Sequence, residues 1–133
     1  MSIELEIITP EKVILSTNAK DVNITTKAGK IGLLSGHIPI ITELELGVLK
    51  LVDENREVSY AIKGGHAQKI GDSVSVLTEE AIKSSDIDEV LVNKKLASLE
   101  KDLEDAQVNK KAKNRLISSI RFYQLQLSLL KKR

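Results

Sequence analysis

The sequence predicts an all-β N-terminal sandwich followed by an α-helical C-terminal hairpin of two antiparallel helices. Two observations support this division. All seven glycines and both prolines lie at or before Gly71, so the rest of the chain lacks both residues that interrupt helices. Apolar residues also alternate with period two in the first part and recur every three or four residues in the second. We therefore expect a β-sandwich domain over residues 1–84 and a helical-hairpin domain over residues 85–133.

Short apolar runs separated by turn signals fill the first domain. Turns are expected at residues 53–55, at Gly64–Gly65 and at Gly71–Asp72. Many short strands with frequent turns are typical of a sandwich or barrel, and an aliphatic interior needs no cofactor or metal to form. The predicted strands include residues 3–7, 13–15, 22–26, 48–51, 58–62, 66–69 and 74–77.

The stretch from residue 29 to residue 41 is the most distinctive part of this domain. Glycines at positions 29, 32 and 36 interrupt an apolar run, which indicates places where the backbone bends or approaches another segment closely. Alternation on both sides predicts two short strands around a tight corner, and Pro39 suits an edge or corner position. From the residues alone, this stretch is interpreted as a structural corner.

Two seams of apolar residues predict the two helices of the second domain. Ser84, Ser85 or Asp86 can cap the first helix, while Asp88 and Glu89 suit the positive end of its dipole. Both seams have the 4-3-4-3 spacing of a helix that packs against one partner. The first seam contains Val92, Leu96, Leu99, Leu103 and Ala106, and the second contains Leu116, Ile120, Tyr123, Leu127 and Leu130.

Residues 107–110 are the expected turn between the helices, and they contain neither glycine nor proline. The hairpin is the expected arrangement, although the same residues could continue as one long helix. A further apolar line on the second helix contains Phe122, Leu125 and Leu129, with Ile117 alongside. This line either packs on the sandwich or is offered to other proteins in an alternative state, and a hairpin that alternates would do both.

Composition and charge exclude several classes of function. The net charge of +1 and the shortage of aromatic side chains argue against nucleic-acid binding. The sequence has no cysteine, no apolar run long enough to cross a membrane and no signal peptide at its start. Residues 110–133 nevertheless carry eight basic residues and no acid. Since the whole chain has a net charge of +1, residues 1–109 have a net charge of −7. Such a basic tail is either a solvated helix face or a docking element for an acidic partner.

No pattern of catalytic residues is present. His37 and His66 are the only histidines, and their spacing matches no common metal-ligand motif. Phosphate-binding and nucleophile-elbow motifs are also missing. We expect no catalytic residues, no metal site and no cofactor.

Four motifs together resemble the epsilon subunit of the bacterial F-type ATP synthase. Residues 29–40 follow the order G-x-x-G-[IL]-[LY]-x-G-H-x-P-[LI], and residues 7–10 (I-I-T-P) resemble the family's V-V-[ST]-P opening. Residues 64–68 (G-G-H-A-Q) resemble its G-G-[FI]-x-E segment, and residues 86–88 (D-I-D) resemble its D-[IL]-D. Ser35 replaces a usual proline, and His66 and Gln68 replace an apolar residue and a glutamate.

This resemblance implies a non-catalytic central-stalk subunit that couples rotation between the gamma subunit and the membrane c ring during ATP synthesis. It implies a peripheral position on the cytoplasmic side of the bacterial inner membrane, reached only through the complex, and an isolated chain that is a monomer. The coupling ion, a proton or sodium, belongs to the c ring and stays open. Implied contacts with gamma or the c ring are Lys30, Leu33, Leu34, His37, Ile38 and Pro39, where Lys30 reverses the charge of a usual glutamate.

The resemblance also implies a C-terminal tail that inhibits ATP hydrolysis by entering the alpha/beta catalytic head, where the beta subunit presents an acidic loop. The implied tail residues are Lys110, Lys111, Lys113, Arg115, Arg121, Phe122, Leu125 and Leu129. Some epsilon subunits bind ATP through the pattern I-D-x-x-R-A. Here Ile87, Asp88 and Arg121 remain, but Leu91 stands where the arginine would be. Leucine offers nothing to a phosphate, so we expect weak or absent ATP binding.

The alternative hypothesis is an unrelated β-sandwich adaptor that self-associates through its helical hairpin. The mass of the isolated chain separates the two hypotheses, because the adaptor would form a stable dimer.

Overall fold

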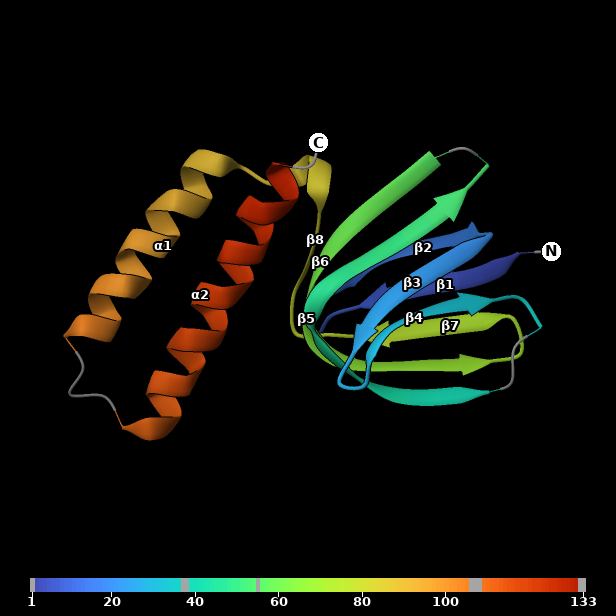
Figure 1. Ribbon diagram of the computed structural model, residues 1–133, viewed down its shortest axis with the longest axis horizontal. Helices are drawn as coiled ribbons and strands as arrows, with labels where there is room; N and C mark the ends of the chain where they lie inside the picture. The colour runs from blue at the N-terminus through green and yellow to red at the C-terminus, as the bar shows by residue number, and fades with distance from the viewer. Residues whose placement is uncertain (1, 37–38, 55, 106–108, 132–133) are drawn as a thin grey trace. The chain divides into compact units, whose positions relative to one another are not determined.

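The computed structural model describes residues 2–36, 39–54, 56–105 and 109–131. The chain divides into two compact units, residues 1–83 and residues 84–133, and each is described by itself. The first unit is a β-sandwich and the second is a pair of helices (Figure 1). The predicted fold class is therefore confirmed.

One continuous sheet forms the sandwich, with strand order β2-β1-β7-β6-β5-β3-β4 and β8 paired with β6. The two longest strands, β5 and β6, curve so that each contributes to both layers (Figure 1). One part of β6 pairs with β7, and another part pairs with β8. The strands are β1 Ile3–Ile8, β2 Val13–Ala19, β3 Asp21–Thr26, β4 Gly29–Leu34, β5 Ile40–Asp53, β6 Arg56–Ile70, β7 Ser73–Leu77 and β8 Ala81–Lys83.

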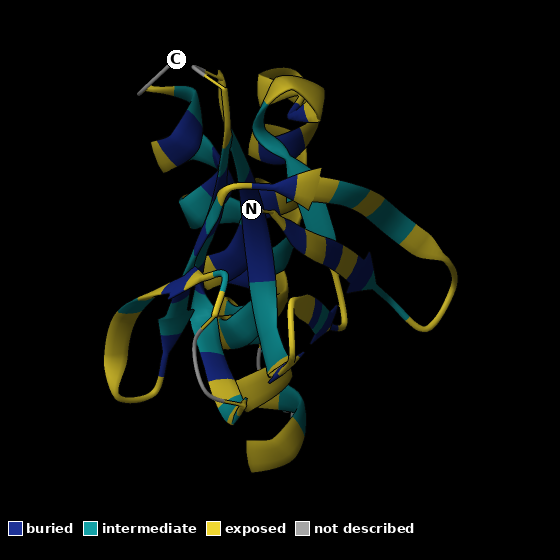
Figure 2. Ribbon diagram, turned by 90° about the vertical axis from the view of Figure 1, so that its right-hand side faces the viewer, coloured by how far each residue is buried: buried dark blue, intermediate teal, exposed yellow. Residues whose placement is uncertain are grey.

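Period-two alternation directs apolar side chains into the space between the layers. Ile3, Leu5 and Ile7 of β1 are each exposed by 1% or less, while their neighbours in sequence face outward. Figure 2 shows the same alternation of buried and exposed residues along other strands. The aliphatic core predicted from the sequence is thus present, and removal of its apolar surface from water is the main driving force for folding.

The expected turn at Gly64–Gly65 is wrong, because both glycines lie inside β6. They have positive φ angles of 77° and 107° at the point where β6 exchanges β8 for β7 as a neighbour. A Cβ atom on Gly65 would collide with the carbonyl group of Leu77. The glycines therefore permit a change of partner within a continuous strand and do not reverse the chain.

The second unit contains the 3-10 turn η1 (Ser84–Asp86) and helices α1 (Glu89–Glu104) and α2 (Lys110–Leu130). The expectation that residues 84–86 cap the first helix is wrong. Asp88 is the N-cap of α1, and its side chain accepts a hydrogen bond from the backbone N–H of Leu91 at 3.2 Å. Asn109 caps α2 in the same way and accepts from the N–H of Ala112 at 2.8 Å.

Two helices form, and not one long helix. The structure confirms burial for Val92 and Leu96 in the first seam and for Ile120 in the second. The other described seam residues are half-buried. Ala106 and the expected turn residues 107 and 108 lie outside the described part of the chain, and Lys110 is already the first residue of α2.

Candidate functional site

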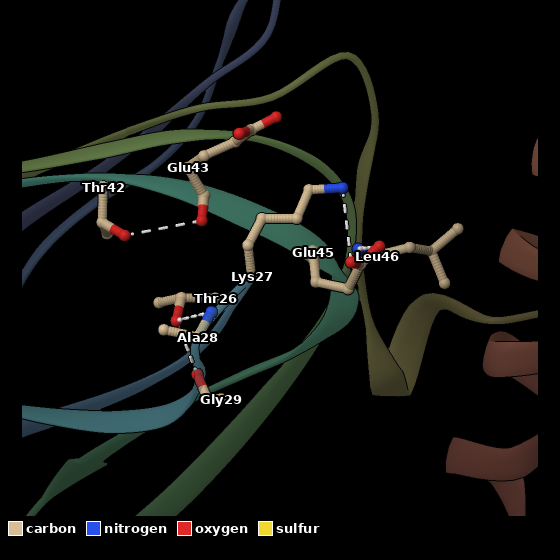
Figure 3. A network of polar contacts seen from close by, with 8 residues as sticks. All are labelled: Thr26, Lys27, Ala28, Gly29, Thr42, Glu43, Glu45 and Leu46. Carbon is tan, nitrogen blue, oxygen red and sulfur yellow. Dashed lines mark hydrogen bonds and ion pairs between the residues drawn. The ribbon is translucent and has the colours of Figure 1, made fainter.

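The β3–β4 hairpin begins the segment of residues 29–41. The Thr26 hydroxyl donates to the Gly29 carbonyl at 2.7 Å and accepts from the Ala28 N–H at 3.1 Å, which closes the turn (Figure 3). Next to it, the Lys27 ammonium lies 3.3 Å from a carboxylate oxygen of Glu45 (Figure 3). Since β4 ends the strand order, the hairpin lies at the edge of the sheet. These contacts hold the start of the segment on the sandwich.

The residues predicted to contact the rotor differ in exposure. Lys30 and Pro39 are exposed, and Leu34 is 44% exposed although it is apolar. Leu33 is only 2% exposed and belongs to the core, so its side chain supports the segment from inside and leaves the proposed contact set. The alternation of β4 explains the difference, because Leu33 and Leu34 face opposite sides of the strand. His37 and Ile38 lie outside the described residues.

Sequence reasoning missed the residue that holds the middle of this segment. Asp72 lies in the turn between β6 and β7. Its Oδ1 atom accepts from the Ser35 hydroxyl at 2.9 Å and from the Gly36 N–H at 3.2 Å. These two hydrogen bonds hold the pKa of Asp72 below its ordinary value, with a smaller contribution from the charge of Lys69. Local sequence signals identified only a turn here, because the hydrogen-bonding partners lie more than thirty positions earlier.

A buried lysine lies beside this turn. Lys69 is only 1% exposed, and its ammonium group donates to the Gly71 carbonyl at 2.6 Å. Burial of a lysine is favourable only when its charge is hydrogen-bonded or paired. The sequence around Lys69, with Gln68 before it and Ile70 after it, gave no signal of this role.

The predicted regulatory residues of α2 divide into an exposed basic group and an apolar group. Lys110, Lys111, Lys113, Arg115 and Arg121 are all exposed. Phe122 and Leu129 are 3% and 6% exposed, and Leu125 is half-buried. Gln126, which sequence reasoning missed, is 3% exposed, whereas Ile117 is 38% exposed.

These buried residues form a second line on α2. With about 100° of rotation per residue, Phe122, Gln126 and Leu129 lie on a face roughly 140° from that of Ile120 and Leu127. One partner helix uses only one such face. Helix α2 is therefore built for contacts on two sides.

The residues left of an ATP-binding pattern have structural roles. Ile87 is 6% exposed, and Asp88 uses its carboxylate to cap α1. Leu91 is 52% exposed and Arg121 is exposed. Within the described ranges, no three His, Asp or Glu side chains gather in a way that could hold a metal ion. In those same ranges, neither helix combines the length and apolar character that crossing a membrane requires.

The fold and these surfaces define a two-part protein whose exposed features suit contacts with other proteins. The family described as "ATP synthase, Delta/Epsilon chain, beta-sandwich domain" matches residues 2–84. The ATP synthase epsilon chain of Roseiflexus sp. (strain RS-1) is 38% identical over 67% of this chain and 64% of its own length. The chloroplastic epsilon chain of Arabidopsis thaliana is 31% identical over 80% of this chain and 81% of its own. The chain belongs to the ATP synthase delta/epsilon family, as the four motifs indicated.

Two solved structures have the same fold. One is the Euglena gracilis mitochondrial ATP synthase OSCP/F1/c-ring assembly, with a TM-score of 0.77 at 22% identity, over 97% of this chain and 81% of the matched chain. The other is the central stalk and c ring of the Tetrahymena thermophila mitochondrial ATP synthase, with a TM-score of 0.60 at 12% identity, over 98% and 97%.

Proposed function

We propose that this chain is a non-catalytic rotor subunit of an F-type ATP synthase. It binds the gamma subunit and the c ring, couples their rotation during ATP synthesis and acts at the cytoplasmic face of a bacterial inner membrane. The observation that carries this proposal is the family match over residues 2–84, which covers the whole sandwich. The named homologues are epsilon chains, and both structural neighbours are assemblies that include a c ring.

The rotor contact is the segment of residues 29–41, with Lys30, Leu34 and Pro39 as its exposed members. An exposed cation and an exposed apolar side chain on the same strand can combine charge complementarity with burial of apolar surface. The positive charge of Lys30 favours a c-ring loop that presents a carboxylate or carbonyl groups. His37 and Ile38 belong to the same proposed contact on sequence grounds.

Charge reversal and polar replacement test this surface. We expect Lys30→Glu and Leu34→Asp each to weaken binding of the full chain to a purified gamma subunit–c ring complex, by roughly tenfold. Lys12→Glu is the matched control, because Lys12 is also an exposed lysine of the sandwich but lies between β1 and β2, neither of which pairs with β4. Equal affinities for all three variants and the unchanged chain would remove the rotor contact from this surface.

The helical unit is a regulatory element that restrains ATP hydrolysis. Four exposed basic residues occupy the first two turns of α2, and the first turn contains no acid. Positive charge at a helix N-terminus opposes the helix dipole, so an acidic surface on a partner would relieve this repulsion. The acidic loop of a beta subunit in the alpha/beta head is the partner proposed here.

The second apolar line of α2 supplies the short-range part of this interaction. Phe122, Leu125 and Leu129 can bury their surface against the head in an alternative state of the hairpin. A difference of a few kcal/mol between the two states would let nucleotide or rotor load decide which is populated.

A further inference from the structure

We propose that Asp72 is the positioning residue of the rotor-facing segment. Its carboxylate holds Ser35 and Gly36 so that Leu34 and Pro39, on either side, are presented in one fixed arrangement. The inference rests on the proposed function, because it adds a residue outside residues 29–41 that determines how this segment meets the rotor.

The connection after β4 passes from one part of the sheet to another. The register of β4 with β3 ends where Leu34 pairs with Asp21. The chain enters the sheet again at Ile40, which pairs with Lys69 of β6. Ser35 and Gly36, the described residues directly after Leu34, no longer belong to the β3–β4 ladder, so other contacts must determine their position.

Asp72 meets this connection at its first two residues. One oxygen, Oδ1, receives both the Ser35 hydroxyl at 2.9 Å and the Gly36 N–H at 3.2 Å. Gly36 has a φ of 86°, a left-handed conformation that glycine adopts readily. Because such a glycine is also free in other conformations, a bond to its own N–H is well placed to select one of them.

Asp72 is itself held from two sides. Its backbone carbonyl accepts from the N–H of Glu4 in β1 at 2.7 Å. The preceding residue, Gly71, is fixed through its carbonyl by the buried ammonium of Lys69. The carboxylate therefore projects from a turn that is anchored to β1 and β6. Because its own position is fixed, it can restrict the motion of Ser35 and Gly36.

The hydrogen-bond acceptor of this contact is an exposed and ionised carboxylate. Asp72 is exposed, so its two hydrogen bonds can open and close without disturbance of the core. Hydrogen bonds to an ionised carboxylate are stronger than those to a neutral oxygen. Asp72→Asn keeps a carbonyl oxygen in the same place, whereas Asp72→Ala removes the acceptor.

The experiment combines the motion of Gly36 with rotor affinity, both measured on the full chain. In Asp72→Ala, we expect the backbone order parameter of Gly36 to fall from about 0.85 toward 0.6. We expect the affinity of this variant for the gamma subunit–c ring complex to fall roughly fivefold to tenfold, because the entropy cost of ordering the segment then opposes binding. Ser35→Ala should give a smaller change, and Asp72→Asn should restore affinity to within about twofold.

Glu6→Ala is the matched control, since Glu6 is an exposed carboxylate of β1, and neither measurement should change. A pH titration of the Gly36 amide signal adds a further check, because the signal follows the ionisation of Asp72 only if the carboxylate accepts this hydrogen bond. Its midpoint should lie below 3.8 and should rise in Ser35→Ala, because the Ser35 hydroxyl lowers the pKa of Asp72.

Two results would overturn the inference. If Gly36 stays ordered in Asp72→Ala, the carboxylate does not position the segment. If Gly36 becomes mobile while affinity is unchanged, the positioning has no effect on the rotor. In that second case, Lys30→Glu shows which hypothesis has failed. If Lys30→Glu weakens binding, the contact surface stands and only the role of Asp72 is wrong. If Lys30→Glu leaves binding unchanged, the contact surface is wrong as well.

Discussion

The sandwich and the helical hairpin are stabilised by contacts of very different range along the chain. In the sandwich, Glu4 of β1 pairs with Ser73 of β7, so the sheet closes only when most of the domain is present. In the hairpin, each helix is capped by a side chain that accepts a hydrogen bond from a backbone N–H only three positions later, and the two helices follow each other along the chain. The first unit is thus cooperative and the second is assembled from local parts.

Core burial differs in the same sense. Among the described residues, 15 buried side chains form the core of the sandwich, whereas the buried residues of the two helices number six: Val92, Leu96, Ile120, Phe122, Gln126 and Leu129. A well-packed core that depends on long-range pairing is suited to a fixed attachment. A hairpin with a thinner core is suited to change its arrangement, because less buried surface is lost when it opens.

The largest effect is expected at Gly65. Gly65→Ala should lower the free energy of unfolding of the sandwich by at least roughly 3 kcal/mol, because φ is 107° and the new Cβ would collide with the Leu77 carbonyl. Gly71→Ala is the matched control, with φ of 60° and open space around its Cβ position, and should cost only about 1 kcal/mol. Urea denaturation compares the two. Similar losses would show that the close approach of Gly65 to the Leu77 carbonyl does not determine the stability of the sandwich.

Deletion of residues 110–133 should act on regulation and leave the sandwich folded. We expect ATP hydrolysis by the assembled synthase to rise roughly fivefold, since both the basic group and the second apolar line of α2 are removed. Steady-state hydrolysis measurements with the reconstituted complex test this expectation. An unchanged rate would assign α2 a structural role only.

The helix caps should have an intermediate effect that is confined to the hairpin. Asp88→Ala and Asn109→Ala each remove the acceptor of an N-cap hydrogen bond and should cost the helical unit about 1 kcal/mol. Asp88→Asn retains a capping oxygen and should cost much less. Amide hydrogen exchange, measured separately for the two units, is the suitable method. Equal loss of protection in the sandwich would contradict the independence of the two units.

The smallest effect is expected from charge alone. Replacement of the exposed group Lys110, Lys111, Lys113, Arg115 and Arg121 by glutamine should raise hydrolysis only part of the way to the deletion mutant. The difference from the unchanged chain should shrink as salt is added, because exposed charges are screened. A salt-independent difference would mean that long-range attraction is not involved.

Local patterns predicted the two-part fold because alternation and seam spacing report burial directly, as Ile3–Ile7 and Val92–Leu96 illustrate. They failed where long-range contacts decide. Gly64 and Gly65 resemble a turn in sequence, but the neighbours β7 and β8 determine their place inside β6. Asp72 was missed for the same reason, because its partners come from the connection after β4. Leu33 was assigned to the contact although its position in β4 directs it into the core.

Binding of the sandwich alone to the rotor tests the central claim most directly. A chain truncated after Ser84 retains the whole compact first unit and the region matched to the family. We predict that it folds, as shown by cooperative unfolding, and binds a purified gamma subunit–c ring complex with nearly the affinity of the full chain. A truncated chain that is folded but does not bind would contradict the assignment of rotor attachment to the sandwich.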